Sequence, residues 1–222
     1  MSRMYDVVTF DCYGTLIDWE RGIWESIQAA AQSVGAHPER DAVLAAYAEI
    51  EPDVETERFR SYREVLTTCA ERIAERFGWD LPPERSHFLA ESLPFWPPFP
   101  DTGPALSRLA AAGYRLGILS NCDEDLLAAT RRHFPVSFEI VVTAERVRSY
   151  KPAHGHFLEA RRRIGNAGWL HAAQSHFHDV VPCRELSIPS AWVNRKGEAA
   201  SGGILPDREV PDLARLADWL AP

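Results

Sequence analysis

The chain has 222 residues and a formal net charge of −8, from 24 lysines and arginines against 32 aspartates and glutamates. Hydrophobic residues make up 45% of the chain and charged residues 25%, which excludes a disordered or low-complexity protein. An acidic chain has no general attraction for nucleic-acid phosphates or anionic lipid. We therefore expect neither nucleic acid nor a membrane among its partners.

The cysteines and the start of the chain bear on its compartment. No two cysteines have the spacing of a metal or redox motif, which favours reduced thiols in the cytoplasm. The first residues lack the long apolar stretch of a signal peptide, and no segment approaches the roughly 20 apolar residues of a membrane span. We expect a cytoplasmic protein. The four cysteines are Cys12, Cys69, Cys122 and Cys183.

The first third of the chain passes from a strand into a helical segment. Tyr5 to Phe10 is a short, apolar run rich in β-branched residues, which predicts a buried strand ending at Asp11. From about residue 20 to residue 91 the sequence has helical periodicity. One helix is predicted from apolar residues three or four apart, with its end at Gly78: Phe59, Tyr62, Leu66, Cys69, Ile73 and Phe77.

Beyond a proline-rich connector at residues 94–100, helices alternate with short apolar strands. Helices are predicted over about 103–112, after Asp123 as the N-cap, and from Pro152 in the first turn to Ile164. The predicted strands are Arg115–Leu119, Ile140–Val142, Leu170–Ala173 and Ala191–Val193.

This order predicts an α/β fold with a doubly wound parallel sheet covered on both faces. Residues 1–16 and 97–222 form the predicted core, and residues 17–96 a helical cap inserted after the first strand. Ligands of open parallel sheets bind outside the carboxyl ends of the strands. The polar residues that follow the four strands are Asp11 with Thr15, Ser120 with Asn121, Lys151, and Asp179.

In this order, the residues resemble the four motifs of the haloacid dehalogenase superfamily, and the match covers the whole predicted core. The helical insertion occupies the place of that family's cap domain. Residues 192–195 (WVNR) also resemble its last core strand. The matching motifs are Asp11-x-Tyr13-Gly14-Thr15, Ile118-Leu119-Ser120-Asn121, Tyr150-Lys151-Pro152, and Asp179.

Tyr13 bears on the type of reaction. Phosphatases of this superfamily have an aspartate there, which protonates a departing alkoxide, and such an acid contributes typically about 10²–10⁴-fold. A halide is a weak base and leaves without an acid. The Asp-x-Tyr-Gly-Thr form is also similar to the 2-haloacid dehalogenases of the superfamily, so the motif favours cleavage of a carbon–halogen bond.

The resemblance implies covalent catalysis through an ester on Asp11, giving a 2-hydroxy acid from a short 2-haloacid, without a metal or other cofactor. Lys151 is implied to keep Asp11 ionised, and Asp179 to position Lys151 and activate water. Hydrogen bonds to an anionic small-molecule substrate are expected from Thr15, Ser120 and Asn121. Tyr13 and His176 are also expected to contact it.

The chain departs from the family's pattern at several positions. Gln174 stands where phosphatases often carry an acid, His176 replaces an expected amide, and Phe157 replaces a tyrosine. The dehalogenases use a cap arginine to bind the leaving halide, and here its counterpart stays open. The candidates are Arg58, Arg60 and Arg63, although solvated positions on an amphipathic helix are the more ordinary role for each.

Other side chains near the motifs have two interpretations. His176, His178 and Asp179 could bind a metal, but no fourth ligand stands nearby, and hydrogen bonds that orient the Asp179 loop are favoured. Cys12 is expected to be a small buried residue. Phe99 is expected to pack in the hinge between the domains, whereas Phe95 and Trp96 could either do so or line a pocket.

Three alternatives to the dehalogenase hypothesis remain. The same Asp11 chemistry could act on a non-halogenated small carboxylic acid. A magnesium-dependent phosphatase ranks lower because of Tyr13. A catalytically silent binding protein is disfavoured because Asp11, Lys151 and Asp179 are all present. A homodimer is expected only from the resemblance.

Overall fold

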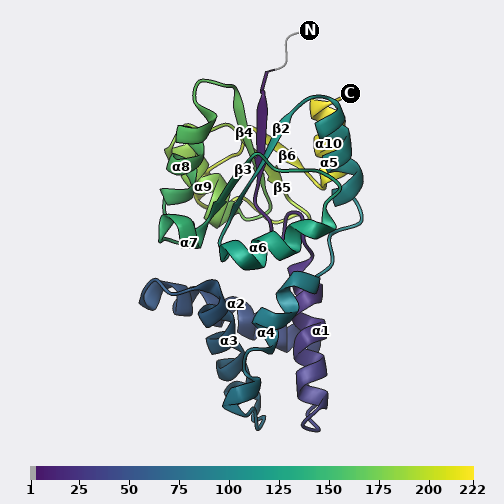
Figure 1. The fold of residues 1–222 in the computed structure, drawn as a ribbon, viewed down its shortest axis with the longest axis vertical. Coiled ribbons are helices and arrows are strands. Elements are labelled where there is room, and N and C mark those ends of the chain that lie inside the picture. Colours follow the sequence, from purple (N-terminus) through teal and green to yellow (C-terminus); the bar gives the residue numbers. More distant parts are fainter. Residues whose placement is uncertain (1–3) are drawn as a thin grey trace.

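The computed structural model describes residues 4–222, and a six-stranded, entirely parallel sheet is its centre (Figure 1). The order across the sheet is β3-β2-β1-β4-β5-β6. The reversal of direction beside β1 makes the sheet doubly wound, as expected. The strands are β1 (Val7–Phe10), β2 (Arg115–Ser120), β3 (Ile140–Thr143), β4 (Trp169–Ala173), β5 (Ser190–Val193) and β6 (Arg208–Val210).

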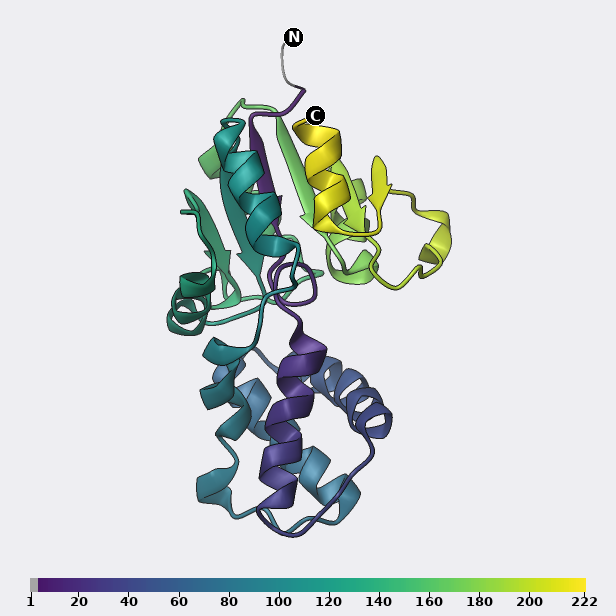
Figure 2. The same ribbon diagram turned by 90° about the vertical axis from the view of Figure 1, so that its right-hand side faces the viewer.

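Helices cover both faces of the sheet (Figures 1 and 2). One face packs against α5 (Thr102–Ala111) and α10 (Leu213–Leu220), and the other against α8 (Gly155–Ile164) and α9 (Val181–Glu185). Alternate residues of β1 pack on opposite faces of the sheet. Val8 and Phe10 belong to the larger apolar cluster, and Val7 belongs to the smaller one. This alternation follows from the two-residue period of a strand. Two short helices complete this part, α6 (Glu124–Thr130) and α7 (Ala144–Val147).

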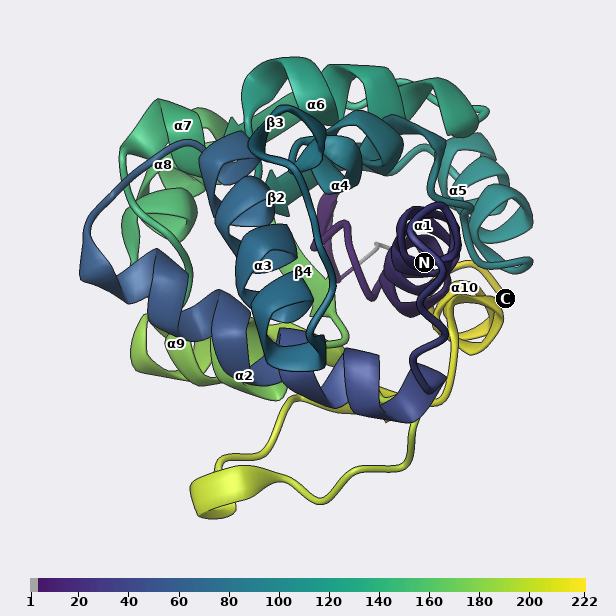
Figure 3. The same ribbon diagram turned by 90° about the horizontal axis from the view of Figure 1, so that it is seen from below.

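Four helices lie beyond the carboxyl ends of the strands (Figures 1 and 3). The third begins with a capping box between Ser61 and Glu64 and ends at Gly78 in the left-handed conformation, as predicted. The boundaries of this unit at residues 17 and 96 stay a prediction. Within residues 4–222, no helix has the length and apolar character needed to cross a bilayer. The four helices are α1 (Trp19–Gln32), α2 (Arg40–Glu57), α3 (Tyr62–Phe77) and α4 (Phe88–Ser92).

Two local predictions were wrong, and one strand was not predicted. Phe59 precedes α3, which begins at Tyr62, and its ring stacks on Tyr150 instead. Helix α8 begins at Gly155, because the backbone of Lys151 bonds to the side chain of Asn121 and holds the preceding turn outside the helix. Strand β5 is followed by a sixth strand that the sequence did not indicate.

Asp123 connects the helical unit to the core. It occupies the N-cap position of α6, as predicted, but its carboxylate makes no capping bond there. Instead the backbone N–H groups of Tyr62 and Arg63 donate to its two oxygens at 2.8 and 2.9 Å. Two orphan donors of α3 are thus satisfied by an acid of the core, which also complements the positive end of that helix.

Candidate active site

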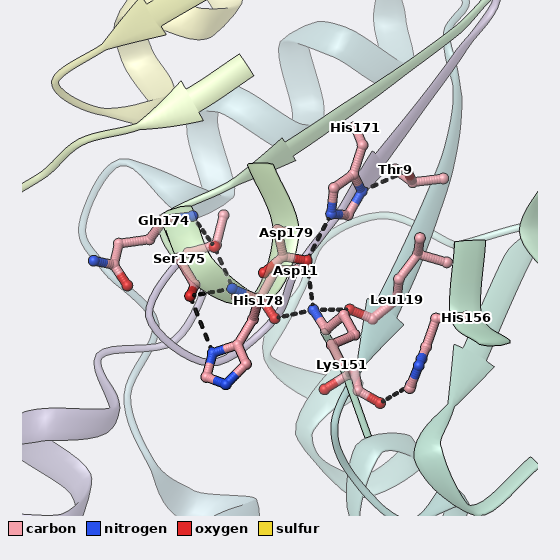
Figure 4. Close-up of polar contacts among 12 residues, drawn as sticks. Thr9, Asp11, Leu119, Lys151, His156, His171, Gln174, Ser175, His178 and Asp179 are labelled. Atoms are coloured by element: carbon pink, nitrogen blue, oxygen red, sulfur yellow. Dashed lines mark hydrogen bonds and ion pairs between the residues drawn. The ribbon is translucent and has the colours of Figure 1, made fainter. Parts of the chain in front are cut away.

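Asp11, Lys151 and Asp179 meet at the carboxyl ends of the strands (Figure 4). The Lys151 ammonium donates to Oδ1 of Asp11 at 2.9 Å, to Oδ1 of Asp179 at 2.7 Å and to the Leu119 carbonyl at 3.0 Å. Its three N–H groups are therefore all used. The lysine is 2% exposed, and a cation buried so deeply requires such partners.

The three charges alter one another's proton affinity. Burial raises the pKa of Asp11 above its ordinary value of 3.8, although the Lys151 charge works in the other direction. Burial opposes ionisation of Asp179 as well, but there the Lys151 charge and the His171 hydrogen bond prevail and lower the pKa below 3.8. The Lys151 pKa is raised above 10.5, because the two carboxylates outweigh its desolvation. The lysine therefore stays protonated at neutral pH.

Two of the residues expected to bind substrate form hydrogen bonds with Asp11 and with the backbone of Lys151. Thr15 donates its hydroxyl to Oδ2 of Asp11 at 2.8 Å and accepts the backbone N–H of Gln174. Asn121 uses both ends of its amide on the Lys151 backbone. The structure thus gives Thr15 and Asn121 hydrogen bonds that hold Asp11 and Lys151 in place.

His176 does not reach the site, which contradicts the expected substrate contact. Its two ring nitrogens bond the Ile204 carbonyl and the Ser201 hydroxyl, and its ring packs edge-on against Trp192. The short π-helical turn at residues 176–180 directs it away and directs His178 toward the site. His178 is held there by Ser175, 3.0 Å from its Nδ1 (Figure 4).

His171, in β4, is a buried partner of Asp179 that the sequence analysis missed. The Trp169 indole, which can only donate, bonds the Thr9 hydroxyl at 2.7 Å. The Thr9 hydroxyl also lies 2.8 Å from Nδ1 of His171, and Nε2 of His171 lies 2.9 Å from Oδ1 of Asp179. This chain of contacts holds the His171 ring and orients Asp179.

A cavity of about 260 Å³ opens above Asp11, between the sheet and the helical unit. Its volume is just below the roughly 300–1,000 Å³ of pockets for drug-sized ligands, so it fits a small molecule. Ser120 and Asp179 line it, and the Ser120 Oγ and Asp179 Oδ2 are buried without a hydrogen-bond partner in the described part of the chain. The lining residues of the core also include Asp11, Tyr13, Asn121, Lys151, Gln174, Ser175 and His178.

Tyr13 lines the cavity with its ring. Its hydroxyl is 2.9 Å from the Thr130 hydroxyl, and the ring meets the edge of Trp96. Trp96 lines the cavity as well and is 2% exposed, whereas Phe95 is 78% exposed. A Cβ on Gly22 would lie 2.2 Å from the Trp96 ring, so only glycine lets α1 approach this closely. Trp96 is thus a pocket residue.

None of the three candidate arginines lines the cavity. Arg63 pairs with Asp125 at the surface at 2.7 Å. Arg58 is exposed. The helical unit instead contributes these side chains from α1, α2 and α3: Trp19, Ile23, Tyr47, Ala48, Glu51, Pro52, Glu55 and Tyr62.

The remaining expectations concern packing. Phe157 is fully buried and lies edge-on against His171, outside the cavity. Cys12 is fully buried in the core, as expected. Phe99 packs beneath the Arg195 guanidinium, 3.9 Å from the ring centroid, at the junction of the two units.

Within residues 4–222, no three histidine, cysteine, aspartate or glutamate side chains form a cluster of the kind that holds a metal. The bonds of His176 explain this for the trio weighed from the sequence: its nitrogens face residues 201 and 204, while Asp179 faces Lys151.

Comparisons with known proteins agree with this geometry. The family model of haloacid dehalogenase-like hydrolases matches residues 5–173. The chain belongs to this family. The resemblance inferred from the motifs is therefore confirmed, as is the α/β fold.

Relatives of this hydrolase match it along nearly its whole length. The (S)-2-haloacid dehalogenase H-109 of Pseudomonas putida is 26% identical over 220 residues, 96% of each chain. A second (S)-2-haloacid dehalogenase of that organism is 27% identical over 224 residues, covering 96% of this chain and 95% of the relative. The crystal structure of the L-2-haloacid dehalogenase RSc1362 has a TM-score of 0.84 at 22% identity, over 98% of this chain and 99% of that chain.

The sequence analysis missed the residues of α2. Tyr47, Glu51 and Glu55 are spaced four apart, so they lie on one helix face. Polar groups on a face that also carries the buried Val43 and Val54 are the signal that could have identified them. Without knowing what that face packs against, the same spacing is typical of a solvated helix.

Proposed function

We propose that this hydrolase cleaves the carbon–halogen bond of short 2-haloacids through an ester on Asp11. The observation that carries the proposal is the Asp11 carboxylate, paired with a buried lysine, at a small cavity in which position 13 is a tyrosine and not a carboxylic acid. The names of the relatives support the same reaction class.

The first step is displacement at carbon 2. An Asp11 oxygen forms a bond to that carbon, the carbon–halogen bond breaks, and halide leaves with the electron pair and with inversion. The Ser120 hydroxyl, which has no partner in the described structure, is a donor for the substrate carboxylate. Lys151 and Thr15 hold the attacking carboxylate in place and in its ionised form.

The second step is hydrolysis of the ester. Water attacks the Asp11 carbonyl carbon, and the bond between that carbon and the ester oxygen breaks. The ester oxygen, which came from Asp11, leaves as the hydroxyl of the 2-hydroxy acid, and the water oxygen stays in the Asp11 carboxylate. One proton is released overall. The unpartnered Oδ2 of Asp179 is the acceptor that orients this water, and His171 and Lys151 keep its carboxylate ionised.

Two alternatives are disfavoured on particular contacts. For a phosphatase, the residue two after Asp11 would have to protonate an alkoxide, but the Tyr13 hydroxyl bonds Thr130. A silent binding protein has no need for a lysine buried between two carboxylates, which is costly to desolvate. Action on a non-halogenated small carboxylic acid uses the same groups and stays an alternative. A homodimer and a cytoplasmic location remain predictions.

The test is halide release from 2-chloro-, 2-bromo- and 2-fluoroacids in metal-free buffer. We expect release by the wild type and none by Asp11→Asn, with Asp125→Asn, the same change at an exposed aspartate, as the control. A single turnover in ¹⁸O-water should place label in the Asp11 carboxyl. Silence across the panel, or label found only in the product, would overturn the proposal.

A further inference from the structure

The helical unit presents acids to the cavity where the family resemblance implied an arginine. Glu51 and Glu55 of α2 both line it, with Tyr47 beside them and Tyr62 from α3. Among the described residues that line the cavity there is no arginine, and the single lysine, Lys151, is already bonded to Asp11 and Asp179. The leaving group would therefore depart toward carboxyl groups.

Glu51 accepts hydrogen bonds from two tyrosine hydroxyls of the helical unit. The Tyr47 hydroxyl donates to its Oε1 at 2.6 Å, and the Tyr62 hydroxyl donates to the same oxygen at 2.5 Å. Both tyrosine hydroxyls are therefore used on Glu51, and neither is directed to Glu55.

Glu55 lies one helical turn further on and has the opposite surroundings. It is half-buried, with no hydrogen-bond or ion-pair partner in the described part of the chain. Burial, and then the Glu51 charge, raise the pKa of Glu55 to about 9, against a smaller opposing effect of Lys151. Two neighbouring carboxylates in such a place do not both ionise. At neutral pH, Glu55 is a carboxylic acid with a hydrogen to donate.

Glu55 also lies on the side from which a leaving group departs. Asp11, directly after β1, and Glu55, in α2, both line the cavity. Helix α2 belongs to the helical unit, which lies beyond the strand ends (Figures 1 and 3). In a displacement with inversion, the leaving group departs opposite the nucleophile, toward that unit. The unpartnered Ser120 hydroxyl remains on the Asp11 side for the substrate carboxylate.

We propose that Glu55 donates a hydrogen bond to the leaving group, so that this site takes 2-substituted acids whose leaving group is a strong hydrogen-bond acceptor, fluoride above all. This rests on the proposed function and names the leaving group within it. As the carbon–fluorine bond breaks, fluoride takes the electron pair and accepts the Glu55 hydrogen bond, and Glu55 keeps its proton. The helical unit thus supplies a hydrogen-bond donor to the leaving group, and no proton is transferred.

Three variants separate the effects on the leaving group. Glu55→Met removes the donor, Glu55→Gln keeps an N–H donor that does not titrate, and Glu49→Gln is the control on the same helix, where Glu49 pairs with Arg76 at the surface. We measure kcat/KM for 2-fluoropropionate and for 2-bromopropionate, and we divide the first value by the second. One lost hydrogen bond to a charged group should lower the ratio for Glu55→Met by about tenfold or more. Glu55→Gln should lie between Glu55→Met and the wild type.

The pH dependence is the second kinetic measurement. Glu55 is protonated below its pKa, so fluoride release should fall as pH rises through about 9, and Glu55→Gln should lack this fall. The raised pKa values of Lys151, Tyr47, Tyr62, Tyr150 and Cys69 lie well above that range. The groups that face Glu55 or share its cavity are Glu51, Tyr47, Tyr62, Cys69, Tyr150, Lys151, Asp11, His178 and Asp179.

A measurement without substrate keeps this inference separate from the proposed function. The infrared difference between wild type and Glu55→Gln should contain a protonated carboxyl band at pH 7 that is lost above pH 9. Bromide release by the wild type with an unchanged ratio in Glu55→Met, or absence of the band, would overturn the role of Glu55 while dehalogenation stands. No halide release from any substrate, with the band present, would overturn the proposed function and the leaving-group assignment together.

Discussion

At the scale of single residues, the site depends on one buried cation among acids. Lys151 is fixed by Asp11, Asp179 and a backbone carbonyl, and these contacts leave it no N–H group to bind substrate. Its contribution is electrostatic. It keeps two buried carboxylates ionised, which neither could be alone.

Lys151→Met should therefore destabilise the protein as well as abolish halide release. Removing one member of a buried ion pair costs about 3–5 kcal/mol, because the carboxylates are left uncompensated. Urea unfolding at pH 7.5 should show this loss, and the difference from the wild type should shrink at pH 5 as a carboxyl becomes protonated. An equally stable variant would mean that the carboxylates are solvated or already neutral.

The raised pKa of Asp11 predicts the acidic limit of activity. In the proposed reaction the ionised form of Asp11 attacks, so activity should be lost as pH falls through the Asp11 pKa, and burial raises that pKa above the ordinary value of 3.8. The pH dependence of kcat/KM for a bromoacid, within the range where the fold is stable, measures it. An acidic limit at or below 3.8 would contradict the desolvated environment described for Asp11.

At the scale of elements, the strand ends place the site residues at one edge of the sheet, and the loops orient their side chains. Strand β1 ends directly before Asp11 and β2 ends at Ser120, so the parallel sheet brings both to the same edge. The turn after β4 decides which histidine faces the cavity, and it selects His178. The sequence indicated that this loop matters, but not the orientation of its side chains.

A substitution of Asp123 tests the contact between the core and the first turn of α3. In Asp123→Ala, the first turn of α3 loses two hydrogen bonds, at an expected cost of about 1–2 kcal/mol, the range of a lost helix cap. Hydrogen exchange at the amides of Tyr62 and Arg63 should become faster. Asp125→Ala is the control, since its exposed pair with Arg63 is worth less than about 1 kcal/mol. Equal exchange in both variants would mean that Asp123 does not hold α3.

At the scale of the whole molecule, much of the stabilising core lies away from the cavity. Helices α5 and α10 pack against one another and the sheet (Figures 1 and 2), and α10 contributes no residue to the cavity lining. This separation lets the cavity contain unpartnered polar atoms and two neighbouring glutamates, which are unfavourable for stability.

Leu216→Ala tests this separation. Leu216 is fully buried in α10, so the substitution should cost about 2–5 kcal/mol through lost burial and a cavity. Below the unfolding temperature, kcat for halide release should not change. Leu205→Ala, the same substitution at a 68% exposed position, should change stability by less than about 0.5 kcal/mol. A large fall in kcat for Leu216→Ala would show that the two regions are coupled.

The sequence by itself determined the parallel α/β sheet and the residues at its edge. Short apolar strands alternating with helices admit few other arrangements, and Asp11, Ser120 and Lys151 follow strands whose ends must meet. The tertiary structure alone decided what faces these residues. Glu51 and Glu55 meet the residues of the sheet only in the folded chain. The contacts that connect Trp169, Thr9, His171 and Asp179 likewise join segments far apart in the chain. The turn after β4 directs His178 to the cavity. A side chain's charge and orientation depend on burial and on neighbours that local spacing does not encode.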